Sequence, residues 1–203
     1  MSLVARLALL ALLASLAVHA QPSLVLYLAA VPPEAVAEQA MKAEFASLTE
    51  PLGLHTEWRS LAARTSEGES NQLIVVHLSG NCSAAAEASA VATGTPIASV
   101  QEAGGRILPF IDVHCDALTA LLRPSLKELS AYQQRSLLGQ ALARILAHEV
   151  YHITGQTHDH TASGLTQARL NSTELTARRL EPARHSAPSA DFTSPSTITE
   201  DRD

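Results

Sequence analysis

Residues 148–158 of the chain read HEVYHITGQTH. They close the longest periodic segment of the sequence, which runs from about Ser130 to Thr154 with apolar residues at spacings of three and four. This spacing predicts a long amphipathic helix. His148 and His152 are four residues apart and extend the stripe of that helix that faces the core. The segment therefore places two imidazoles on the buried side of a helix.

The histidines and the acidic residue beside them form a pattern typical of a zinc site. Imidazoles one helical turn apart can bind one metal ion at about 2.0 to 2.1 Å, with Glu149 beside the position of a water molecule. Gly155 favours the left-handed conformation that ends a helix, which would let the chain bring His158 back to the metal as a third ligand. By chance, the whole HExxHxxGxxH pattern is expected in on the order of one shuffled sequence in ten thousand. We therefore predict one Zn²⁺ ion, with its fourth coordination position open as in catalytic sites.

Residues 148–158 resemble the zinc-binding motif of the metzincin metallopeptidases. The resemblance implies that His148, His152 and His158 are the zinc ligands and that Glu149 is the general base of peptide hydrolysis. The expected order of strands and helices before the motif is also similar to that of a metzincin upper domain. The HE-x-YH core in a short exported chain with two cysteines resembles small secreted zincin-like proteins of bacteria. The expected function is that of a secreted zinc metalloendopeptidase acting on a peptide or protein substrate.

Two residues next to the third ligand leave its identity open. Asp159 or His160 could bind the metal in place of His158 if the loop runs differently, or could orient a ligand imidazole through a hydrogen bond. The same ligands could also hold zinc in a protein that does not hydrolyse peptides, and the histidines could bind no metal at all. A non-catalytic zinc-binding secreted protein is therefore the alternative function.

One feature of metzincins is missing from the sequence. Metzincins carry a methionine turn beneath the metal, downstream of the third ligand, whereas the methionines of this chain are Met1 and Met41. The turn over residues 163–165 could serve in its place, with Leu165 as the apolar floor. The chain that follows His158 is also short, so the lower half of a substrate cleft would be small.

The rest of the chain predicts one mixed α/β domain over residues 21–182. Runs of leucine and β-branched residues between turn signals predict five strands, at residues 23–30, 55–61, 72–78, 96–101 and 107–113. The glycines at 104–105 predict a hairpin turn between the last two. Helical spacing and capping residues predict four helices, at residues 33–49, from 117 to a break at Pro124, 130–154 and 171–180. With the resemblance, we expect an α/β (α+β) zincin-like fold, in which a mixed, mostly parallel sheet packs against the long helix.

The two ends of the chain differ in composition from the middle. Residues 1–20 combine Arg6, an apolar run and a small-residue ending, which is the pattern of a cleavable export signal. The run is short of a membrane span of about 20 apolar residues, and no later segment approaches that length. Residues 183–203 are rich in Ser, Pro, Thr and Asp and predict a disordered tail. We expect a secreted or periplasmic protein.

Cys82 and Cys115 are the two cysteines of the chain. In an exported protein, a disulfide between them is the default expectation, and it would close a loop of about 34 residues, worth roughly 3 to 4 kcal/mol. The alternative is a pair of metal-binding thiolates. Neither cysteine has a second one two to four residues away, so the sequence favours the disulfide.

The charge balance excludes two classes of partner. The chain carries 14 basic and 20 acidic residues, for a net charge of −6. A nucleic acid or an anionic membrane would call for a clustered basic face. The one basic cluster, over residues 169–184, is interleaved with Glu174 and Glu181. We expect neither partner.

Overall fold

The computed structural model describes residues 23–29, 33–60, 72–85, 92 and 94–180. The expected export signal over residues 1–20 and the expected tail over residues 183–203 lie outside these ranges. In the described part of the chain, no helix is both long and apolar enough to cross a membrane.

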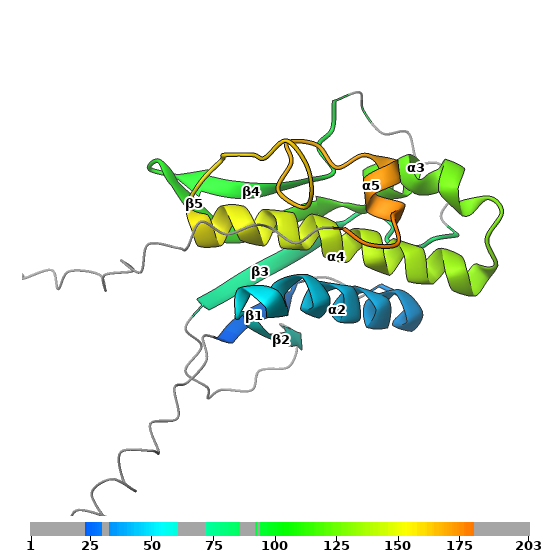
Figure 1. The fold of residues 1–203 in the computed structure, drawn as a ribbon, viewed down its shortest axis with the longest axis horizontal. Coiled ribbons are helices and arrows are strands. Elements are labelled where there is room, and N and C mark those ends of the chain that lie inside the picture. Colours follow the sequence, from blue (N-terminus) through cyan, green and yellow to red (C-terminus); the bar gives the residue numbers. More distant parts are fainter. Residues whose placement is uncertain (1–22, 30–32, 61–71, 86–91, 93, 181–203) are drawn as a thin grey trace, which may run out of the picture.

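A five-stranded sheet forms one layer of the molecule (Figure 1). Its strands are, in chain order, β1 (Ser23–Leu28), β2 (His55–Ser60), β3 (Gln72–Ser79), β4 (Ala98–Ala103) and β5 (Arg106–His114). They are arranged in the order β2-β1-β3-β5-β4. All neighbouring pairs are parallel except β4 with β5, which is antiparallel and places β4 at one edge. The predicted mixed α/β fold with a mostly parallel sheet is therefore confirmed.

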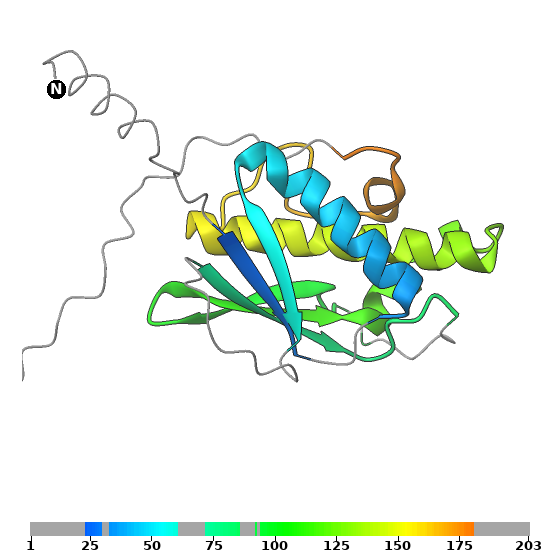
Figure 2. The ribbon, with the colours of Figure 1, turned by 90° about the horizontal axis from the view of Figure 1, so that it is seen from below.

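The helices form the second layer. They are, in chain order, α2 (Ala35–Thr49), the short 3-10 helix η1 (Glu50–Leu52), α3 (Cys115–Leu126), α4 (Ala131–Gly155) and α5 (Ser172–Thr176). Figure 2 shows α2 and α4 side by side on one face of the sheet. The two helices approach closely where Gly139 of α4 faces the backbone of Ala37 on α2. A side chain at position 139 would collide with the Ala37 carbonyl, so this approach requires glycine.

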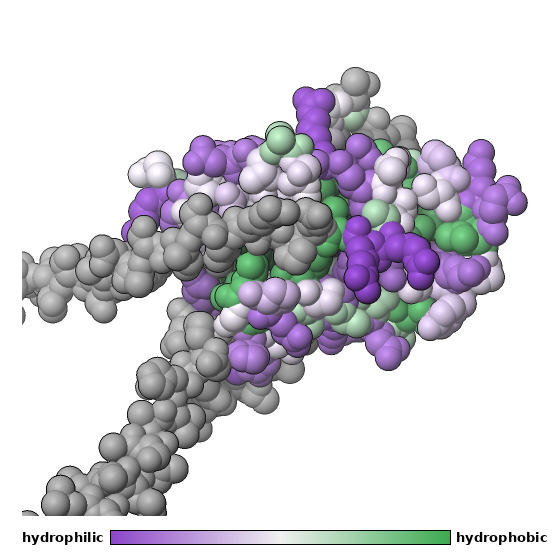
Figure 3. Space-filling model, in the orientation of Figure 1, coloured by the Kyte–Doolittle hydropathy of each residue, from purple (hydrophilic) through white to green (hydrophobic). Residues whose placement is uncertain are grey.

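Helix α4 is the central element of the helical layer. Ser130 and Gln133 cap its N-terminus in a reciprocal capping box, as the sequence signals for a helix start require. Its apolar stripe packs on the sheet, with Leu138 and Leu142 almost fully buried. On the face seen in Figure 3, hydrophobic residues show mainly along the line of this helix, with hydrophilic residues on either side. The predicted helix over residues 130–154 is thus confirmed to within one residue at each end.

A buried arginine ties α4 to its neighbours. Arg144 is 1% exposed, and its Nε and Nη2 atoms each lie 2.8 Å from Oε1 of Glu44 on α2. Its Nη1 donates to the Glu174 carbonyl of α5, also at 2.8 Å. An arginine can be buried because its charge is paired and its donors are satisfied. Through this residue, α5 and the chain before it are fixed against the middle of α4.

Two of the predicted helices end at residues other than those expected. Helix α3 continues through Pro124 and ends at Leu126. Because Pro124 lies in the last turn, its missing N–H removes at most one hydrogen bond near the helix end, and the helix tolerates it. The last helix ends at Thr176 instead of continuing to residue 180, and Ala177 has the extended ψ of 146°.

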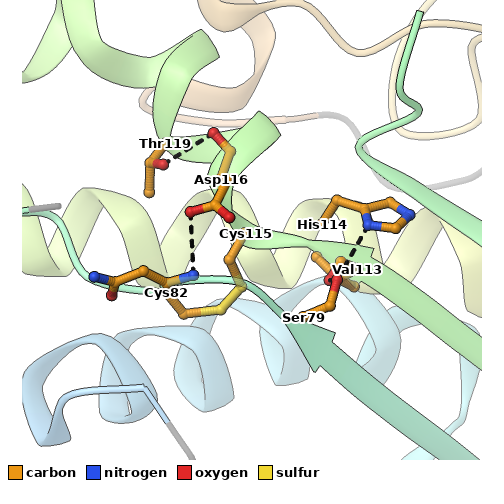
Figure 4. Close-up of a disulfide and its surroundings, with 8 residues drawn as sticks. Ser79, Cys82, Val113, His114, Cys115, Asp116 and Thr119 are labelled. Atoms are coloured by element: carbon orange, nitrogen blue, oxygen red, sulfur yellow. Dashed lines mark hydrogen bonds between the residues drawn. A yellow bond between two sulfur atoms is a disulfide. The ribbon is translucent and has the colours of Figure 1, made fainter. Parts of the chain in front are cut away.

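The two cysteines form the predicted disulfide, which joins the chain after β3 to the start of α3 (Figure 4). Cys82 follows β3 and Cys115 begins α3, and their Cα atoms are 4.8 Å apart in the disulfide. Next to it, Oδ1 of Asp116 accepts a hydrogen bond of 3.2 Å from the Asn81 backbone N–H. Gly80 has a φ of +78°, and a side chain there would collide with the Asp116 carboxylate. The turn after β3 therefore packs closely on the start of α3.

Candidate metal centre

His148 and His152 lie on the last two turns of α4. His152 is 5% exposed and His148 is half-buried. The two rings are nearly perpendicular, with centroids 4.6 Å apart, and their Nε2 atoms approach to 3.0 Å. The spacing of four residues thus brings both imidazoles to one point, as predicted from the sequence.

Hydrogen bonds to backbone carbonyls fix the orientation of both rings. Nδ1 of His148 lies 2.8 Å from the Leu165 carbonyl oxygen, and Nδ1 of His152 lies 2.7 Å from that of Thr157. A carbonyl oxygen only accepts, so each Nδ1 must carry the hydrogen. In the neutral rings, both Nε2 atoms therefore present lone pairs.

Burial keeps these rings neutral. It lowers the pKa of His148, and it lowers the pKa of His152 to about 4. Two neutral rings whose Nε2 lone pairs face each other at 3.0 Å cannot hydrogen-bond through those atoms. A cation between them would turn this repulsion into two favourable contacts. The chemistry of the pair therefore fits a metal ion that prefers imidazole ligands.

A third imidazole completes a group that could hold a metal ion. One ring nitrogen each of His148, His152 and His160 lies within 4.8 Å of the others. The His160 ring stacks against that of His148 at a centroid distance of 5.5 Å and lies 4.9 Å from that of His152. Among the described residues, this is the group of metal-ligating side chains that the structure brings together. Of the two alternatives for the third ligand, the geometry favours His160.

His158 lies next to this group but faces a different partner. Its ring centroid is 6.0 Å from that of His152, and its Nε2 lies 3.3 Å from Oε1 of Glu102 on the edge strand β4. Asp159 is exposed and donates its backbone N–H to Oγ1 of Thr157. The structure thus links His158 to the sheet edge, a contact that no local sequence signal indicates.

The end of α4 differs from the prediction by one residue. Gly155 still belongs to the helix, and Gln156 adopts the left-handed conformation, with φ 46° and ψ 42°. The expectation that Gly155 would reverse the chain is therefore wrong. The physical reason is a long-range contact: the Gln156 side chain forms two hydrogen bonds with the backbone of Ile107 on β5. The reversal then starts one residue later than local preference predicts.

A tight turn lies beneath the histidines where the sequence suggested one. Thr161 and Thr166 close it through a backbone hydrogen bond of 2.9 Å and a contact of 2.7 Å between their hydroxyls. Gly164 has a φ of +83°, and Leu165 is 1% exposed. The side chain of Leu165 is thus buried beneath the histidines, and its backbone carbonyl accepts the hydrogen bond from His148.

Glu149 is buried beside the first histidine. It is 7% exposed, and this burial raises its pKa from an ordinary value of 4.5 to about 7. A carboxyl group with a pKa near neutrality can both accept and donate a proton in that range. Tyr151, two residues after Glu149, is half-buried with its ring 5.5 Å from that of His152.

The burial of Glu149 predicts that the free energy of unfolding of the metal-free protein decreases as the pH rises and this carboxyl group ionises. Between pH 4.5 and 7 the folded state holds a proton that the unfolded state releases, so the stability contributed by Glu149 is full below pH 4.5 and is lost as the pH rises through 7. Glu149→Gln does not titrate. In the presence of a chelator, we expect this variant to unfold like the wild type near pH 4.5 and to be more stable at pH 8 by up to about 3 kcal/mol. Urea unfolding at several pH values measures the difference.

Saturating zinc supplies the control for this experiment. A bound cation stabilises the ionised carboxylate. The difference in free energy of unfolding between the wild type and Glu149→Gln at pH 8 should therefore become smaller. If, in the presence of a chelator, this difference in free energy of unfolding is the same at every pH, the buried environment assigned to Glu149 is contradicted.

Comparison of the chain with protein-family models, with curated proteins and with solved structures finds no significant match to any of them. The interpretation of the site therefore depends on its own geometry and chemistry.

Proposed function

We propose that this chain is a zinc-dependent peptidase with a metzincin-like site. The observation that carries the proposal is the pair of facing Nε2 atoms of His148 and His152, 3.0 Å apart, with a nitrogen of His160 within 4.8 Å. Neutral imidazole is a preferred ligand of Zn²⁺, and three protein ligands are typical of catalytic zinc. These three histidines would hold the ion.

The residues around the ligands supply the rest of the chemistry. Zinc, when bound, supplies a Lewis acid that activates water and polarises a carbonyl group. Glu149 accepts a proton from the attacking water and delivers it to the leaving amine, the two proton transfers of general acid–base catalysis. The carbonyls of Leu165 and Thr157 hold the two helix imidazoles in the tautomer that a metal requires.

The edge strand β4 supports a peptide as substrate. In the described sheet β4 pairs on one side with β5, and no described strand pairs with its other side, where another extended chain could add. Addition of a peptide to an exposed sheet edge is a common mode of peptide recognition. The contact between Glu102 of β4 and His158 brings this edge close to the metal ligands.

Two further features agree with the resemblance to secreted zincins. A mostly parallel sheet with one antiparallel edge strand precedes the long helix that carries the motif. The disulfide between Cys82 and Cys115 suits an oxidising compartment, which supports export to the periplasm or the cell exterior.

Metal analysis together with a peptidase assay tests the proposal. The protein, purified without chelators, should contain about one equivalent of zinc and should cleave an unfolded protein such as casein in a reaction that a chelator stops and added zinc restores. Less than a tenth of an equivalent of zinc would contradict the proposed metal site and the peptidase activity that depends on it. A full equivalent of zinc with no cleavage across a broad peptide library would reject the peptidase and retain the metal site.

One observation favours a second function, that of a non-catalytic zinc-binding protein. His158 is a fourth imidazole beside the group, with its ring 6.0 Å from that of His152. Four protein ligands close the coordination sphere of zinc and are typical of structural sites. In that case, the metal would hold the loop after α4 in place and hydrolyse nothing.

A further inference from the structure

Gln156 ends α4 in a conformation that few residues other than glycine adopt. In the described part of the chain, it is the one non-glycine residue with a positive φ. A side chain in the left-handed region costs roughly 1 to 2 kcal/mol. Its neighbour Gly155, which could adopt this conformation without cost, lies instead in the helix, where glycine is unfavourable. The local preferences at the end of the helix would place glycine in the left-handed position and glutamine in the helix, which is the reverse of what is found. Another contact must therefore hold Gln156 in the left-handed conformation.

The side chain of Gln156 supplies that contact. Its Nε2 donates to the carbonyls of Ile107 and Ile153, both at 2.9 Å, and its Oε1 accepts from the Ile107 N–H at 3.3 Å. The amide therefore pairs with both backbone groups of Ile107, as a neighbouring strand would. Ile107 lies in β5 opposite Glu102 of β4. The end of α4 is in this way attached to the β4–β5 hairpin.

This attachment sets the course of the chain into the metal centre. The Gln156 N–H bonds to the Ile153 carbonyl and the Thr157 N–H to the His152 carbonyl, which is the pair of hydrogen bonds of a Schellman motif. The next group along the chain is the Thr157 carbonyl, which lies 2.7 Å from Nδ1 of His152 and orients that ring. Three residues further on, the chain delivers His160.

We propose that Gln156 is a positioning residue of the metal centre. Its amide holds the left-handed turn against β5, so that the Thr157 carbonyl fixes the His152 ring and the loop brings His160 to the other two imidazoles. This inference rests on the metal site proposed above. It also accounts for a glutamine at a position that glycine would fill with less strain: the side chain is needed for the site and not for ending the helix.

Two substitutions separate this role from a merely structural one. Gln156→Gly removes the amide and also the backbone strain, so the free energy of unfolding should change little while zinc affinity falls about 10- to 100-fold, the usual loss when a group that orients a metal ligand is removed. Gln156→Glu keeps the size and the acceptor but loses both donated hydrogen bonds, and it should show a similar loss. Competition with a chromophoric chelator measures the affinity, and the absorption spectrum of the cobalt-substituted protein reports the ligand geometry.

Gln134, at the other end of α4, offers a matched control. Its Nε2 donates to the carbonyls of Leu126 and Leu129, at 2.9 and 3.1 Å. Gln134→Glu loses the same kind of hydrogen bonds far along the helix from the histidines. It should lower the free energy of unfolding and leave both zinc affinity and the cobalt spectrum as in the wild type.

A readout in the metal-free protein keeps this test independent of the proposed function. Nitrogen NMR of the His152 ring should show the Nδ1–H tautomer in the wild type and a mixture of tautomers in Gln156→Gly. Zinc affinities of both Gln156 variants within threefold of the wild type, together with an unchanged tautomer, would overturn the role of Gln156. If the wild type binds no zinc, the proposed function fails, and the tautomer alone decides whether Gln156 positions His152.

Discussion

Replacing His160 by alanine is expected to weaken zinc binding by roughly 10²- to 10³-fold, whereas His158→Ala should change it by less than about threefold. The difference follows from the geometry, because His160 offers a nitrogen within 4.8 Å of those of His148 and His152. His158 instead pairs with Glu102. The magnitude is one ligand's share of the roughly 10 to 16 kcal/mol with which four ligands bind zinc in small domains. Chelator competition on the two variants measures it.

The two variants form a matched pair, since both remove an exposed histidine from the same short loop. The reverse order of affinities would show that the ligand implied by the metzincin motif, His158, binds the metal after all. An equal and large loss in both variants would mean that four imidazoles share the ion. That outcome would favour the non-catalytic function over the peptidase, because no position would remain for water.

The elements that could be predicted from the sequence are those determined by local patterns. Helix α4 was expected over residues 130–154 and spans Ala131–Gly155, because the apolar spacing that predicts it acts within a few residues. Strand β3 was expected over residues 72–78 and spans Gln72–Ser79 for a similar reason, since a β-branched run is bounded by a turn. The hairpin between β4 and β5 follows from two glycines with positive φ at 104 and 105.

The part of the candidate site that lies on helix α4 could be predicted from the sequence, whereas the part on the following loop could not. His148 and His152 converge because residues four apart share one face of a helix, and this needs no tertiary information. The third ligand depends on the loop, whose course is set by Gln156 bonding to β5 and by the Leu165 carbonyl bonding back to His148. Both contacts join segments that are distant along the chain or separated by an irregular loop. Neither leaves a periodic signal in the sequence.

Glu149→Gln is expected to lower the rate of peptide hydrolysis by about 10²- to 10⁴-fold, which is the usual contribution of a general acid or base. Glutamine has nearly the same size as glutamate, so the packing around this buried position should be kept. The amide cannot take a proton from water or pass one to the leaving amine. Zinc content should remain at one equivalent, because the proposed ligands are the three histidines and not Glu149.

The kinetics distinguish a proton-transfer role from a binding role. Loss of the base should appear in kcat with little change in KM, since Glu149 acts on the reacting groups and not on the rest of the peptide. In the wild type, ionisation of Glu149 should contribute an acidic limb to the profile of kcat/KM against pH: activity that needs the carboxylate falls as the pH drops through the pKa of the free enzyme. Zinc lowers that pKa below the value of about 7 that burial produces in the metal-free protein. A Glu149→Gln protein that contains zinc and hydrolyses peptides at the wild-type rate would remove Glu149 from the mechanism.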